Sequence, residues 1–220
     1  MRDVLNDLLA WWRAGETVGM GTVVGTWRSA PRQPGAAMLV GPDDSAVGSV
    51  SGGCVESAVY ALAKDVAADG HPMLQRYGVS DNDAFAVGLT CGGILDVFVE
   101  KVSRETFPEL ADIAADIDAG RPVAVATLVD HPDAKRLGMR MIIRPAEDSP
   151  IFGSLGSARA DAAVADDVRG LLAAGKTELL TYGPEGQRRG EGMRVFAASY
   201  APRPRMLVFG AIDFAAAVAR

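Results

Sequence analysis

The chain contains two cysteines, and each of them stands beside a pair of glycines. Cys54 follows two glycines in the stretch "VGSVSGGCVE", and Cys91 precedes two glycines in "VGLTCGGILD". A cysteine thiolate can act as a nucleophile or as a soft metal ligand, and two thiols can form a redox pair. These two short stretches are therefore the first candidates for chemistry in this sequence.

Cys54 is expected where a strand over 46–50 ends and a helix over 54–70 begins. The first turn of a helix has unpaired N–H groups and a partial positive charge, which favour the thiolate form. Open backbone amides and hydroxyl groups beside the thiol would then form a cradle for an anion. The residues of this predicted cradle are Ser49, Ser51, Gly52 and Gly53.

The second cysteine has a similar setting, just before a predicted strand over 94–102. Its small neighbours are Thr90, Gly92 and Gly93. A cysteine can also serve only as a small apolar side chain in the core, and a Gly-Gly pair can mark only a tight turn. Both interpretations stay open for each cysteine, but the repeated setting favours a chemical role.

A third candidate is Arg32, which lies between two prolines in "SAPRQPG". A forked guanidinium group in a rigid loop suits a phosphate or a carboxylate, although it can also be an ordinary solvated arginine. The chain has two histidines, His71 and His131. Two cysteines and two histidines equal the count of a zinc site, but their spacing shows no pairs of ligands, so zinc is not expected.

The composition excludes several classes of protein. With 49% hydrophobic and 23% charged residues in 220 positions, the chain has the profile of a soluble globular protein. A net charge of -6 without a cluster of Lys and Arg argues against nucleic-acid binding. No apolar run reaches the roughly 18 residues of a membrane span, and acids interrupt the apolar pattern at the N-terminus. We expect a cytoplasmic protein with reduced thiols.

Hydrophobic spacing predicts an α/β fold, in which helices flank a mixed sheet over residues 1–200. The helices are expected at 3–14, 54–70, 104–119 and 157–175. The strands are expected at 17–27, 36–41, 46–50, 73–79, 94–102, 121–130, 138–145, 150–155, 177–183 and 192–200.

The last residues predict a different unit. "APRPR" at 201–205 has the composition of a linker, and 206–220 has the pattern of the first strand and helix of a Rossmann-like domain. One strand and one helix cannot bury both faces of a parallel sheet, so we expect a C-terminally truncated form. The dinucleotide fingerprint requires glycine where this chain has Ile212, so binding of NAD(P) by this chain is not expected.

Several motifs, in this order, resemble the XdhC/CoxI family, whose members are accessory proteins for xanthine dehydrogenase and related molybdenum hydroxylases. The motifs are "RSAPRQPGAAMLV", "GSVSGGCVE", "GLTCGGILDVFVE", "GSLGS" and "RPRMLVFGAIDFA". The resemblance runs from about Gly21 to the C-terminus. It implies a cysteine-bearing N-terminal domain followed by a Rossmann-like domain, most of which is missing here.

The resemblance also implies a function. Members of the family are taken to bind the molybdenum cofactor, a molybdopterin, while a terminal oxo ligand is exchanged for sulfur. They then pass the cofactor to an apo molybdenum hydroxylase, and a cysteine desulfurase supplies the sulfur. On this hypothesis Cys54 contacts the cofactor and its molybdenum, Cys91 assists, and Arg32 holds the phosphate. Such a chain is a maturation factor more than a catalyst.

Other functions remain open from the sequence. Cys54 and Cys91 could form a redox pair, provided that their Cα atoms lie within the ~4.4–6.8 Å that a disulfide requires. The terminal strand and helix leave an NAD(P)-dependent oxidoreductase as a third interpretation, and a purely structural interaction module as a fourth. The apolar residues of "MLVFGAIDFAAAVAR" predict a homodimer, because a truncated unit leaves them uncovered.

Overall fold

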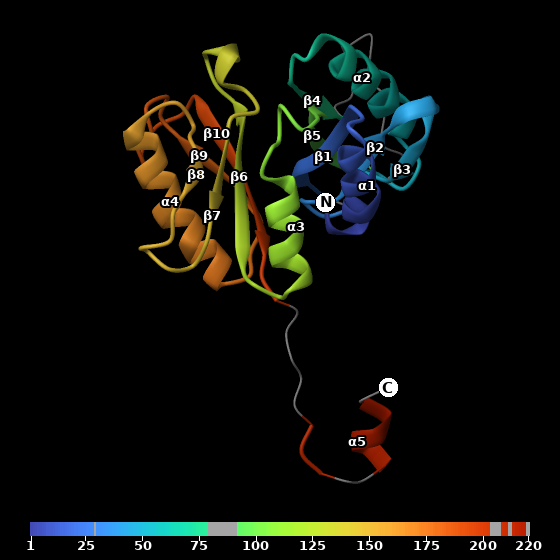
Figure 1. Cartoon of the computed structure of the whole chain (residues 1–220), viewed down its shortest axis with the longest axis vertical. Coiled ribbons are helices and arrows are strands. Elements are labelled where there is room, and N and C mark those ends of the chain that lie inside the picture. Colours follow the sequence, from blue (N-terminus) through green and yellow to red (C-terminus); the bar gives the residue numbers. More distant parts are fainter. Residues whose placement is uncertain (29, 79–91, 203–207, 211–212, 219–220) are drawn as a thin grey trace.

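The computed structural model describes residues 1–28, 30–78, 92–202, 208–210 and 213–218. Figure 1 shows two β-sheets side by side, each with a helix on its outer side, and a short C-terminal helix apart from them. The helices are α1 (Leu5–Ala14), α2 (Glu56–Asp69), α3 (Leu110–Asp118), α4 (Ala158–Ala173) and α5 (Asp213–Val218). The strands are β1 (Val18–Trp27), β2 (Ala37–Val40), β3 (Ala46–Gly48), β4 (Met73–Tyr77), β5 (Ile94–Val102), β6 (Val123–Asp130), β7 (Arg140–Ile143), β8 (Phe152–Gly153), β9 (Glu178–Tyr182) and β10 (Met193–Tyr200).

The two sheets have the same topology. The first sheet has the order β3-β2-β1-β5-β4, and the second has the order β8-β7-β6-β10-β9. Each sheet is preceded by one helix, α1 or α3, and a second helix, α2 or α4, joins its two edge strands. All the strand pairs in the described residues are antiparallel. The chain therefore consists of two structural halves built to one plan.

The register of the central strands repeats as well. Thr22 pairs with Phe98 in the first sheet, and Thr127 pairs with Phe196 in the second. In both sheets the register shifts at the same point, after the pair Val23–Val97 in the first sheet and after the equivalent pair Leu128–Val195 in the second. A shared β-bulge at an equivalent position indicates that the two halves are copies of one ancestral unit.

One glycine in each half has the same steric role. Gly48 and Gly153 have φ angles of 87° and 80°, which residues other than glycine rarely adopt. A Cβ atom at Gly48 would lie 2.3 Å from the carbonyl oxygen of Ala37, and one at Gly153 would lie 2.2 Å from that of Arg140. Only glycine therefore allows the chain to fold this closely over the preceding strand.

The sheets have an outer face covered by one helix and an inner face that meets the other sheet. On the outer face of the first sheet, α2 approaches so closely that a Cβ at Gly19 would lie 2.2 Å from the carbonyl oxygen of Ala63. Helix α4 covers the second sheet in the same way. The inner faces pack together with α1 and α3 into one apolar cluster, which we call the seam. Burial of this cluster joins the halves into one body.

Charged residues also cross the seam. Asp96 of β5 is 1% exposed, and its carboxylate accepts hydrogen bonds from Arg76 at 2.7 and 2.9 Å. Arg194 occupies the equivalent position on β10 and reaches Asp96 at 3.1 Å. A second pair joins Glu100 of β5 to Arg140 of β7, and both side chains are buried. Because a buried charge needs a partner, these pairs fix how the sheets are placed.

The α/β class and the predicted helices and strands are confirmed, with boundaries that move by a few residues. The prediction of a mixed sheet is wrong for the described residues, which form two antiparallel sheets. Each sheet is built from hairpins and from one helix that connects its two edge strands. Helix α2 begins at Glu56, after the cysteine instead of at it. Within the described residues no helix is long and apolar enough to cross a membrane. Parts of the predicted linker and Rossmann-like unit lie outside the described residues, so the domain division stays a prediction.

Candidate functional site

The residues before α2 form a loop around the carboxylate of Glu56. Residues 49–55, called the serine-glycine loop below, turn back so that most of their hydrogen-bond donors face this side chain. Oε1 accepts hydrogen bonds from the Ser49 hydroxyl at 2.6 Å and from the Ser51 amide at 2.9 Å. Oε2 accepts from the Ser51 hydroxyl at 2.5 Å and from the Gly53 amide at 2.8 Å. The loop is thus closed by an acid from the first turn of the helix.

The Ser51 hydroxyl supports the same arrangement. Ser51 is 2% exposed, and its hydroxyl accepts hydrogen bonds from the amides of Cys54 and Val55, each at 3.0 Å. The Gly52 amide donates to the Ser49 hydroxyl at 2.9 Å. These amides were expected to be open to an anion, but they already have acceptors within the chain. The prediction that Ser49, Ser51, Gly52 and Gly53 bind a cofactor remains a prediction.

The ionised form of Glu56 is strongly favoured. Burial alone would raise the pKa of this carboxyl, but hydrogen bonds from the two serine hydroxyls and from backbone amides lower its pKa to about 2. Glu56 was not among the site residues predicted from the sequence. An acid in the first turn of a predicted helix, directly after a run of small polar residues, was the available signal.

Cys54 lies two residues before α2, at the end of the serine-glycine loop. Its side chain is partly buried and packs against the apolar cluster between the first sheet and α2, together with Ala30 and Ala36. Gly52 and Gly53 are exposed and have φ angles of 77° and 117°, so glycine is required there for the backbone conformation. The loop therefore presents the thiol on a backbone that only glycines can form.

Of the second predicted motif, Gly92 is exposed and Gly93 is buried, just before β5. Thr90 and Cys91 lie outside the described residues. The separation of the two cysteines, and with it the redox interpretation, is therefore untested. Ile212, on which the argument against NAD(P) depends, also lies outside them.

Arg32 connects the serine-glycine loop to a cleft between the two halves. Its Nε donates a hydrogen bond to the carbonyl oxygen of Ser49 at 3.4 Å. Arg32 also lines a cleft of about 370 Å³, which we call the first cleft. The other walls of this cleft are residues 1–3, the rest of the loop over 31–36, Thr177, and residues 198–200 at the end of β10. One arginine thus contacts the loop that carries the thiol and also lines a cleft of ligand size.

The second half contains a matching loop without a thiol. Ser154 donates its hydroxyl hydrogen to Asp161 at 2.7 Å, and the Leu155 amide donates to the same carboxylate at 2.7 Å. Asp161 thus takes the place of Glu56, and counting back from it puts Arg159 where the first half has Cys54. The two loops share an architecture, and only the first of them carries a thiol.

The two histidines are not brought together as part of a metal site. His71 lies 3.7 Å from Asp69, while His131 contacts Arg136 and the Pro184 carbonyl. Over the described ranges, no group of three His, Cys, Asp or Glu side chains is arranged to hold a metal ion.

Comparison with known proteins shows which family shares this architecture. The model of the XdhC and CoxI family matches residues 11–78 and again residues 116–183, which together make up more than half of the chain. This chain belongs to the XdhC and CoxI family. The two matches fall on the two structural halves, and each includes the loop closed by Glu56 or by Asp161. The family match thus confirms the resemblance drawn from the motifs, and its double occurrence agrees with the repeated fold.

Two related proteins extend the comparison. The chain is 38% identical over 80 residues to an uncharacterized protein, YqeB, of Escherichia coli (strain K12), a match over 36% of this chain and 15% of YqeB. A solved structure described as a xanthine dehydrogenase from Bacillus halodurans has the same fold, with a TM-score of 0.62 and 21% identity. The match covers 90% of this chain and 52% of that one. The chain therefore spans about half the length of the solved relative and a small part of YqeB.

Proposed function

We propose that this chain is a maturation factor for a molybdenum hydroxylase of the xanthine dehydrogenase or CO dehydrogenase type. In this function it binds the molybdenum cofactor, supports its sulfuration and delivers it to the apo-enzyme. The main observation behind the proposal is that Arg32 both contacts the serine-glycine loop and lines the first cleft. The chain's membership of the XdhC and CoxI family supports the same function.

The side chains in this region fit a molybdopterin. Its phosphate is an anion, and the first cleft has two guanidinium groups, those of Arg2 and Arg32, in its walls. The cleft is large enough for a small ligand. Cys54 offers a soft sulfur donor, and soft metal centres favour thiolate neighbours. A cofactor that spans from the cleft to the loop would meet both groups.

The residues of the chain then have separate tasks. Arg32 binds the phosphate through its fork of N–H donors, and Cys54 either contacts the molybdenum or relays sulfur to it. The bound cofactor supplies a terminal oxo position at which sulfur can be exchanged. Glu56 and Ser51 hold the loop in shape by themselves, so the loop does not need to fold again each time the cofactor arrives or leaves. A carrier benefits from such preorganisation because it must also release what it binds.

Two partners follow from this function. An apo molybdenum hydroxylase would receive the cofactor, and a cysteine desulfurase would supply the sulfur. Since the match covers 52% of the solved relative, docking of either partner can also involve surfaces that the matched part does not include.

Replacement of Cys54 by serine tests the proposal. Cys54→Ser is expected to retain on the order of tenfold less molybdopterin than the parent chain, a loss of about 1.4 kcal/mol of affinity, because a hydroxyl is a poor ligand for a soft metal. The measurement is the amount of molybdopterin that co-purifies with each chain from cells that make the cofactor. Ser57→Ala, an exposed change on the first turn of α2, is the control. Equal retention by Cys54→Ser and the parent would contradict the role of the thiol.

The homodimer expected from the sequence also remains a proposal. In the C-terminal segment Phe209 is 92% exposed and Phe214 is 80% exposed, and apolar side chains of this size are usually covered by a partner. We expect the full chain to sediment as a dimer and a chain that ends at residue 205 to sediment as a monomer. A monomeric full chain at micromolar concentration would refute this proposal.

A further inference from the structure

We infer that the second half of the chain forms a second cleft at the seam, and that this cleft binds a phosphate group. The second cleft measures about 340 Å³, close to the 370 Å³ of the first. It is lined by the loop between β6 and β7, by the end of β5 and by the residues just before β4. The first cleft is lined by the loop between β1 and β2, by the end of β10 and by Thr177, just before β9. These three walls of one cleft thus have their equivalents in the other.

The repeated fold explains why two clefts exist. In each case a loop from one half meets the end of a long strand from the other half. β1 contacts β9 across the seam, and β6 contacts β4, which is the same contact between equivalent strands. Any concave surface that this contact produces on one side of the seam must therefore also appear on the other side. The second cleft is a consequence of the duplication, and all the residues that line it lie in the described part of the chain.

The charge of the second cleft favours an anion. Lys101, Lys135 and Arg140 line it together with one acid, Glu100, which forms an ion pair with Arg140. Within the described residues, neither the Lys101 nor the Lys135 ammonium group forms an ion pair or a hydrogen bond. Nη1 of Arg140 is buried and has no hydrogen-bond partner there either. Two uncompensated ammonium groups leave the cleft with an excess of positive charge, although the whole chain carries a net charge of -6.

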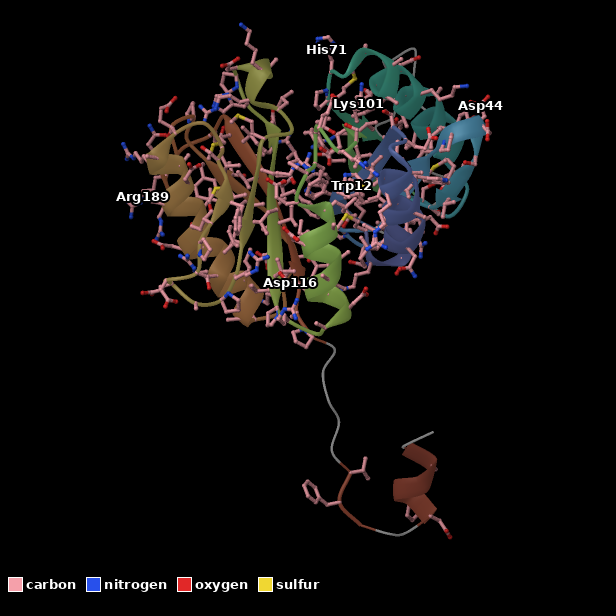
Figure 2. The ribbon with its side chains drawn as sticks, viewed as in Figure 1. Trp12, Asp44, His71, Lys101, Asp116 and Arg189 are labelled. Atoms are coloured by element: carbon pink, nitrogen blue, oxygen red, sulfur yellow. The ribbon has the colours of Figure 1, made fainter. Side chains whose placement is uncertain are left out.

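The basic residues come from both halves. Lys101 stands at the end of β5, and Lys135 lies in the loop between β6 and β7. In Figure 2, Lys101 lies near His71 at the upper end of the seam, on the side of the molecule opposite to Asp116. A ligand that binds both ammonium groups would therefore connect the two halves.

A phosphate is the ligand class that these groups suit best. Ammonium groups act as compact point charges with several donors, and they commonly bind the oxygens of phosphates. Arg159 of α4 stands at the position that Cys54 has in the first half, so no thiol is expected at the equivalent point beside this cleft. The second cleft is therefore a binding site only, for free phosphate or pyrophosphate or for the phosphate of a larger molecule.

The test counts binding sites by isothermal titration calorimetry with inorganic pyrophosphate. We expect two sites per chain in the parent protein, one site in Lys101→Gln/Lys135→Gln and one site in Arg32→Gln. Arg159→Gln/Arg189→Gln removes the same number of positive charges from exposed positions outside both clefts and should keep two sites. Thermal unfolding of each variant checks that it is folded.

The outcomes separate this inference from the proposed function. A single site that only Arg32→Gln removes would overturn the second cleft and leave the first in place. A single site that only the lysine pair removes would support the second cleft and contradict the phosphate role of Arg32. If the parent binds no pyrophosphate, or if the Arg159/Arg189 control loses a binding site as the lysine pair does, the inference that the second cleft binds phosphate is wrong. Parallel titrations with inorganic phosphate and with adenosine monophosphate distinguish the sources, because a site for a larger molecule should bind the nucleotide at least as tightly as inorganic phosphate.

Discussion

Replacing Arg140 with methionine is expected to lower the free energy of unfolding by about 3–5 kcal/mol. Arg140 is 9% exposed, forms an ion pair with Glu100 across the seam and stacks 3.9 Å from the ring centre of Phe107. Methionine preserves much of the apolar contact with the ring but leaves the Glu100 carboxylate without its partner. An uncompensated charge that is 5% exposed is the costly part of this change.

The pH dependence of this loss identifies its cause. Burial raises the pKa of Glu100, while the charge and the hydrogen bond of Arg140 lower it. Without Arg140 the pKa rises further, so the folded state takes up a proton at a higher pH than the unfolded state does. The free energy of unfolding of the variant should then fall as the pH rises, and the loss relative to the parent should be smaller at pH 4 than at pH 7.

Urea unfolding of three chains at both pH values is the measurement. The double variant Glu100→Gln/Arg140→Met removes both charges and should recover much of the stability that Arg140→Met loses, because no ion is then left unpaired. A loss below about 1 kcal/mol in Arg140→Met, or a double variant less stable than the single one, would show that the ion pair does not fix the seam.

The fold was predictable from the sequence where local spacing determines it. Leu5 and Leu8 of α1 are buried as their helical spacing requires, and β6 is buried along nearly its whole length, as its apolar run predicts. The partition of the strands into two sheets was not predictable in this way. It depends on residues far apart in the sequence, such as Asp96 and Arg194, whose contact has no local pattern.

The repeat was present in the sequence but was not recognised. "ETVGMGTVVG" and "RPVAVATLVD" form equivalent strands, yet glycines in the first are alanines or an aspartate in the second. Gly19 is required by the close approach of α2, whereas the equivalent Ala124 is buried in the second half, so the pattern of burial is preserved while identity is lost. The candidate site was predicted in part: small residues around Cys54 indicated a special loop. Glu56 was missed because it belongs by spacing to the helix and only the folded loop turns toward it.

Glu56→Gln is expected to destabilise the chain by about 1.5–3 kcal/mol and to reduce its retention of molybdopterin. The carboxylate accepts hydrogen bonds from the two serine hydroxyls and from the amides of the loop. In glutamine an NH₂ group replaces one oxygen and faces donors where an acceptor is needed. The loop would then lose the conformation in which it presents Cys54.

Acid should have the same effect on the parent chain. Because the pKa of Glu56 is lowered from 4.5 to about 2 in the folded state, its contribution to stability is fully present above pH 4.5. That contribution is lost as the pH falls toward 2, since the proton then binds the folded state as well. Glu56→Gln has no such group, so its stability should fall less over this pH range than that of the parent. A parallel fall in both chains would contradict the role given to this carboxyl.

Asp161→Asn is the matched control for function. It breaks the equivalent loop of the second half, where the acid accepts hydrogen bonds from Ser154 and the Leu155 amide, and it should also lower the free energy of unfolding. Only Glu56→Gln, however, disturbs a loop with a thiol. Retention of molybdopterin at a temperature where both variants are fully folded should therefore fall in Glu56→Gln and not in Asp161→Asn. If the two variants retain equal amounts of molybdopterin, both loops have only a structural role.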